Sequence, residues 1–87
     1  MERIQFIKSI RAIAEAKKNQ LAILRNKGEE GTVEYSILRV EMEDALQIIE
    51  ASKKGDSELQ YVINCVTGFT TSNSILDTCY KFLGKDI

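Results

Sequence analysis

Apolar residues recur every three or four positions in two long stretches of this chain, and a glycine-containing break separates them. Such spacing places apolar side chains along one side of an α-helix, as a half-buried helix requires. In the first stretch, residues 2–26, that side consists of Phe6, Ile7, Ile10, Ile13, Ala14, Leu21 and Leu24. In the second it consists of Tyr35, Leu38, Met42, Ala45, Leu46 and Ile49. The sequence has no proline to interrupt either helix.

The break itself, residues 27–31, contains Gly28 and Gly31. Thr32 follows it, and threonine is a residue type that caps helix N-termini, so the second helix is predicted from Thr32 to about Lys54. A connection this short makes the two helices antiparallel neighbours. The first fifty residues therefore predict a long helical hairpin.

Two shorter helices are predicted after Gly55. Residues 57–60, Ser-Glu-Leu-Gln, match a capping box and predict a helix start at Ser57. Polar residues 70–74 can cap a fourth helix over about residues 73–83, which Gly84 ends. The predicted fold is all-α, a long antiparallel helical hairpin with two short C-terminal helices packed across it, in one domain over residues 1–87.

Charged residues are sorted along the chain. Residues 1–27 hold seven basic and two acidic side chains, whereas residues 28–60 hold three basic and nine acidic ones. The whole chain has a net charge of −1. In the predicted hairpin a basic helix thus lies beside an acidic one, and opposite charges favour that arrangement.

Seven-residue spacing gathers several of these charges into rows. The basic row on the first helix is Arg11, Lys18 and Arg25. The acidic residues of the second helix are Glu34 and Glu41 on one flank and Glu43 and Glu50 on the other. Two hypotheses stay open: the rows pair inside the hairpin, which their proximity favours, or one row stays free to bind an oppositely charged protein.

Two residues of the first helix do not fit its pattern. Lys17 lies within the apolar side, where an unpaired amine is costly, so we expect it to reach the edge of the core or to pair with Glu41. It is also a candidate for a polar contact at an interface. Ile23 lies on the opposite side, near Ala12 and Ala16, where a flat surface would suit another helix. The candidate partner-binding residues are Arg11, Lys17, Lys18, Ile23, Arg25, Glu41, Glu43 and Glu50.

No residue pattern in the sequence indicates catalysis. The chain has no His, no Gly-rich phosphate loop and no nucleophile with a base beside it, and its acidic residues fall on different helix faces. Cys65 and Cys79 do not make a zinc site. We interpret them as reduced, small apolar side chains, with a disulfide between them left open. We therefore expect no enzymatic activity, no cofactor and no metal ion.

A helix-turn-helix interpretation of residues 67–74 is the alternative that would lead to DNA. Asn64 and Ser74 stand where that motif needs a small apolar and a branched aliphatic residue, and the second helix has Asp77 but no Arg. The net charge also disfavours nucleic acid. No apolar run approaches the roughly 20 residues that span a bilayer, and no signal peptide is evident, so we expect a cytoplasmic protein.

The remaining class is a small non-catalytic helical protein that binds another protein and inhibits or regulates it. Antitoxin, immunity, antiholin and anti-defence proteins of phages and plasmids are of this type, and the association rests on size and class alone. The alternative is a self-associating, oligomeric protein in which the first helix of one copy contacts the second helix of another. A DNA-binding regulator is the third and least favoured reading.

Overall fold

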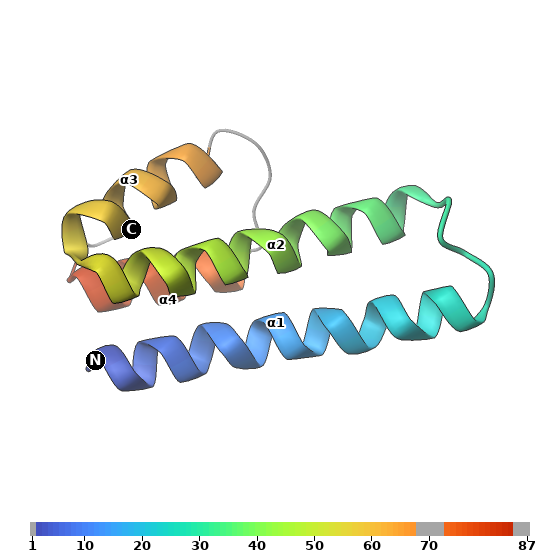
Figure 1. Cartoon of the computed structure of the whole chain (residues 1–87), viewed down its shortest axis with the longest axis horizontal. Helices are drawn as coiled ribbons and strands as arrows, with labels where there is room; N and C mark the ends of the chain where they lie inside the picture. The colour runs from blue at the N-terminus through green and yellow to red at the C-terminus, as the bar shows by residue number, and fades with distance from the viewer. Residues whose placement is uncertain (1, 68–72, 85–87) are drawn as a thin grey trace.

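A computed structural model describes residues 2–67 and 73–84 of the chain, and within these ranges it contains α-helices and no strand. The helices are α1 (Arg3–Asn26), α2 (Val33–Lys54), α3 (Asp56–Thr67) and α4 (Asn73–Leu83). Helices α1 and α2 form a long antiparallel hairpin (Figure 1). Helix α3 lies along the C-terminal half of α2, and α4 contacts α1 at the same end of the hairpin. The all-α prediction is confirmed.

The bend of the hairpin is built by a C-terminal glycine motif followed by a threonine cap. At the end of α1, Gly28 has φ 75°, a left-handed conformation that glycine adopts without strain. The backbone N–H of Glu29 then donates to the carbonyl of Leu24, and that of Gly28 to Arg25, which together form a Schellman motif. At the start of α2, the hydroxyl of Thr32 accepts the backbone N–H of Tyr35 at 3.2 Å. The predicted cap at Thr32 is confirmed.

The predicted start of the third helix is wrong by one residue. Helix α3 begins at Asp56, directly after Gly55, and Ser57 lies inside its first turn rather than at the cap. Gly55 has φ 138° and turns the chain within a single residue, so no connecting segment separates α2 from α3. Residues 70–72, most of the polar run expected to cap α4, lie outside the described residues, while the range of α4 agrees with the prediction.

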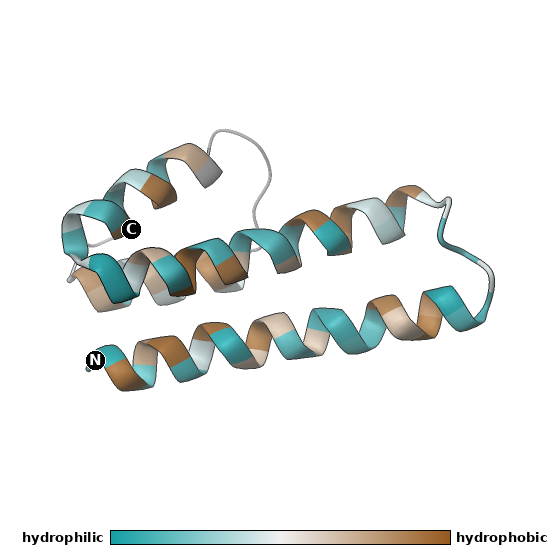
Figure 2. Cartoon of the chain, in the orientation of Figure 1, coloured by the Kyte–Doolittle hydropathy of each residue, from teal (hydrophilic) through white to brown (hydrophobic). Residues whose placement is uncertain are grey.

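The main core lies at the end of the hairpin opposite the bend, where all four helices meet. Its buried residues are Phe6, Ile10, Ala14, Ala45, Ile48, Ile49, Ala51, Leu59, Ile63, Ile75 and Cys79. A second, smaller cluster consists of Leu21, Leu24 and Tyr35 and belongs to α1 and α2 alone. In Figure 2 hydrophobic segments continue along both long helices to the bend, past the ends of α3 and α4. The hairpin thus has a covered half, on which α3 and α4 pack, and an open half, which lies nearer the bend and consists of α1 and α2 alone.

One predicted core residue of α2 is exposed. Leu46 was expected on the apolar side, but 48% of its surface is accessible to solvent. Ile48 and Ala51 are buried instead, because α3 packs on their flank of α2. The placement of α3 therefore decides which flank of α2 is covered.

The two cysteines are free and differ in environment. Cys79 is fully buried, and burial raises the pKa of its thiol to about 12. Cys65 is exposed, so the two thiols differ in accessibility although neither forms a disulfide. We expect a thiol reagent at pH 8 to label Cys65 in the folded protein and Cys79 only after denaturation, since the thiolate is the reacting form. Colorimetric thiol counting with and without urea measures this, and fast labelling of a Cys65→Ser variant in buffer would contradict it.

Candidate functional site

A groove of about 390 Å³ lies between α1 and α2, from the middle of the hairpin towards its bend. Its apolar lining consists of Ala14, Leu21, Ala22, Met42 and Leu46, and its charged lining of Glu15, Lys18 and Arg25. The two alanines end at Cβ, so the surface is hollow where a larger side chain would fill it. Leu46 and Ala22 are exposed along this groove, while Leu21 is buried beneath it. The result is an apolar floor with open access from solvent.

The basic row of α1 forms one edge of this groove. Lys18 and Arg25 line it, and Arg11 is exposed seven residues earlier on the same flank. Arg25 donates a hydrogen bond to the Tyr35 hydroxyl at 3.0 Å and lies 4.0 Å from a Glu30 carboxylate oxygen. The hydrogen bond with Tyr35 raises the pKa of Arg25, and the electrostatic effects of Tyr35 and Glu30 add to the shift. Among the described residues, Arg11 and Lys18 form no ion pair.

Two acidic residues of α2, Glu43 and Glu50, pair within their own helix. Glu43 lies 3.9 Å from Arg39, and Glu50 lies 3.4 Å from Lys53. Glu50 also lines a shallower groove of about 350 Å³ between α2 and α3. Within the described ranges, only one ion pair joins α1 to α2, so the hypothesis that the rows pair across the hairpin is wrong for Glu43 and Glu50. The apolar floor of the groove separates them from the basic row.

The ion pair that joins the two long helices is the one between Lys17 and Glu41. Lys17 Nζ lies 3.5 Å from a carboxylate oxygen of Glu41, and the two side chains are only 15% and 14% exposed. The predicted pairing of Lys17 with Glu41 is confirmed. Because each charge is shielded by the other and by the hairpin, we assign this pair to the inside of the hairpin rather than to a free surface.

Ile23, predicted on the side of α1 opposite its apolar side, lies instead beside residues of α2, on the other flank of the hairpin. It is exposed and lines a recess of about 190 Å³ together with Gln20, Leu24, Lys27, Glu34 and Leu38. Ala12 and Ala16 are also exposed on α1. This recess is half the volume of the groove on the opposite flank and has a more polar lining, so it is the weaker of the two surfaces.

Asp44 is a half-buried carboxyl group beside other acids. Burial raises its pKa above the ordinary 3.8, and Glu43 and Glu41 add to the shift. The folded state thus holds the Asp44 proton more tightly than the unfolded state, so the contribution of this group to stability falls as pH rises through its folded pKa. Asp44→Asn should therefore stabilise the protein at pH 7 by about 0.2–0.5 kcal/mol, the size of a relieved like-charge contact on a helix.

Denaturant titration at pH 7 and at pH 3 measures this effect. Below pH 3.8 the carboxyl group is protonated in both states, so the gain should vanish there. Asp77→Asn, a change at an exposed position of α4, is the matched control and should leave stability unchanged at either pH. An equal gain for Asp44→Asn at both pH values would contradict the assignment.

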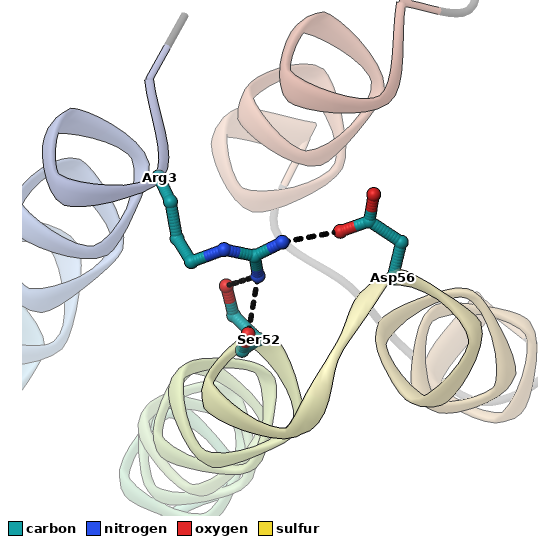
Figure 3. Close-up of polar contacts among 3 residues, drawn as sticks. All are labelled: Arg3, Ser52 and Asp56. Carbon is teal, nitrogen blue, oxygen red and sulfur yellow. Dashed lines mark hydrogen bonds and ion pairs between the residues drawn. The ribbon is translucent and has the colours of Figure 1, made fainter.

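Arg3 is a residue whose role the sequence analysis missed. Its guanidinium donates hydrogen bonds to the backbone carbonyl and the hydroxyl of buried Ser52 and forms an ion pair of 2.6 Å with Asp56 (Figure 3). It also lies over the ring of Phe82, 5.3 Å from the centroid. These contacts join the ends of all four helices, so Arg3 serves the fold rather than a surface. In the sequence alone, a single basic residue near the start of a helix does not predict such a role.

Other kinds of site find no support in the described part of the chain. No group of three or more His, Cys, Asp or Glu side chains there is placed to hold a metal ion. None of its helices combines the length and apolar character needed to cross a membrane. Residues 68–72, which contain the turn of the helix-turn-helix hypothesis, lie outside the described residues.

Comparison of the chain with protein-family models, curated proteins and solved structures found no match.

Proposed function

We propose that this protein is a non-catalytic binding protein that takes up a segment of another protein in the groove between α1 and α2, and inhibits or regulates that protein by occupying its surface. The observation that supports the proposal is the open half of the hairpin. There an apolar floor that includes Leu21 and Met42 continues beyond the two short helices that cover the rest of the core, and Leu46, which also lines the groove between α2 and α3, lies at its inner end.

The shape and composition of the groove favour a helix as the bound element. Two packed helices with small residues between them leave a groove parallel to their axes. A third, amphipathic helix can pack into such a groove, as in a three-helix bundle. Burial of the exposed part of Leu46 and of the neighbouring apolar surface supplies affinity. The charged edges then contribute to orientation and to the rate of association.

Site-specific photo-crosslinking tests this proposal in the cells that produce the protein. A photoreactive amino acid at Ala22, in the groove, should give a discrete adduct with a second protein. The same amino acid at Ala16, exposed on another face of α1, is the control and should give none. An adduct of twice the chain mass would favour the self-associating alternative, and equal adducts from both positions would contradict a groove-specific interaction.

A pair of matched substitutions on α2 provides the quantitative test. Leu46 and Ile37 are 48% and 46% exposed, but only Leu46 lines the groove. Leu46→Gln should weaken binding of the crosslinked partner about tenfold, the loss expected when a well-packed aliphatic contact is removed. Ile37→Gln should leave the affinity within twofold. Equal effects of the two variants would contradict the proposed surface.

A further inference from the structure

We infer that the occupant of the groove is an amphipathic helix whose carboxylates face α1. This inference rests on the proposed function and adds the chemistry of the partner. It begins from the basic edge formed by Arg11, Lys18 and Arg25, which stand seven residues apart and therefore about 10.5 Å apart along the helix. Acidic residues at the same spacing on a helix laid along the groove would meet each of them.

Two of the three charges of this edge, those of Arg11 and Lys18, are available for a partner. Arg11 and Lys18 form no ion pair within the described residues, and the acidic residue in the groove lining is Glu15 alone. On the α2 side the groove lining has no charged residue, and Glu43, beside it on α2, lies 3.9 Å from Arg39. The groove is thus basic on its α1 side and balanced on its α2 side. A bound helix gains most from acidic residues on the flank that faces α1.

A second copy of the chain is a poorer occupant. In a two-fold dimer through this face, each copy presents the same groove, with the same basic row. The α2 carboxylate beside this groove that could meet that row, Glu43, already lies 3.9 Å from Arg39. A foreign acidic helix meets the basic row without breaking this pair, so charge complementarity favours it.

Two synthetic peptides test the inference directly. Both are stapled helices of the same length with the same leucine stripe, and they carry either Glu or Lys at seven-residue spacing on one flank. Fluorescence anisotropy with the full chain should give at least about tenfold tighter binding of the Glu peptide, and this preference should shrink as salt is added. If the Glu peptide binds no more tightly than the Lys peptide, absence of binding by either included, the inference is wrong.

Charge reversal on the protein locates the effect. The double variant Arg11→Glu, Lys18→Glu should lose about tenfold in affinity for the Glu peptide, since two attractive contacts become repulsive, and should gain affinity for the Lys peptide. Lys8→Glu, a reversal at an exposed position that does not belong to the seven-residue basic row, is the control and should change either affinity less than twofold. A loss for Lys8→Glu equal to that of the double variant would overturn the inference.

The natural partner separates failure of the inference from failure of the proposed function. If Leu46→Gln weakens binding of the crosslinked partner but the Arg11→Glu, Lys18→Glu variant does not, the proposed function stands. The inference that the partner is an acidic helix is then wrong. Equal effects of Leu46→Gln and Ile37→Gln overturn the proposed function itself. Sedimentation of the purified chain as a dimer that Leu46→Gln dissociates would assign the groove to a second copy and overturn both.

Discussion

Phe6→Ala should remove a large part of the stability of this protein. Phe6 is fully buried, and its ring stacks on that of Phe82 with centroids 4.4 Å apart and planes inclined by 15°. Removal of a fully buried phenylalanine ring costs about 3–5 kcal/mol, because both the transfer free energy and the contacts around the cavity are lost. Domains of this size are stable by about 5–15 kcal/mol in total, so the variant should unfold at a much lower urea concentration than the parent.

Urea titration followed by circular dichroism at 222 nm measures the loss. Ile4→Ala is the control, because Ile4 lies two residues away on the same helix and is 66% exposed. Its effect should stay within about 0.5 kcal/mol. Loss of the Phe6 ring also removes the stacking partner of Phe82, over which Arg3 lies, so the contacts of Arg3 with Ser52 should weaken as well. Equal destabilisation by the two variants would contradict the assigned core.

The hairpin could be predicted from the sequence because the forces that form it are local. Apolar spacing reports the helical period directly, and the glycine and threonine at the bend determine backbone conformation over a few residues. Gly28 and Thr32 accordingly adopt the conformations that their residue types favour. Lys17 and Glu41 also followed from the pattern, since a charge inside an apolar stripe requires a partner on the facing helix.

The incorrect predictions concern features that tertiary packing decides. Leu46 has the right periodicity for a core position, but α3 covers another flank of α2, and nothing in the local pattern specifies that choice. Ser57 matches a capping box, yet the conformation of Gly55 starts the helix earlier. The acidic residues Glu43 and Glu50 pair with basic residues one turn away on α2 and form no ion pair with α1. Short-range pairs thus replaced the expected long-range ones.

The candidate groove was only half visible in the sequence. The heptad spacing of Lys18 and Arg25 marked its basic edge, because charge rows on a helix can be read from periodicity alone. The hollow itself depends on Ala14 and Ala22, and an alanine in a helix is compatible with any environment. An open apolar floor also requires the absence of a covering helix, which depends on where α3 and α4 end.

Removal of the lysine from the half-buried ion pair between Lys17 and Glu41 should have the second largest effect. Lys17→Met keeps the length of the side chain but leaves Glu41, at 14% exposure, without its cation 3.5 Å away. A charge left unpaired in such a site costs about 1–3 kcal/mol, less than the 3–5 kcal/mol of a fully buried pair because both groups keep some contact with water. Urea titration at pH 7 measures the difference in the free energy of unfolding.

Two further variants show whether burial is the cause. Arg39→Met breaks a pair of similar length, 3.9 Å, whose members are 60% and 59% exposed, and should cost no more than about 0.5 kcal/mol. The double variant Lys17→Met, Glu41→Leu should recover most of the loss or exceed the parent in stability, because no charge is then left in the interior and apolar contacts replace the pair. If the double variant is instead less stable than Lys17→Met alone, the carboxylate of Glu41 must have contacts of its own within the hairpin, and the ion pair would not be the reason for its burial.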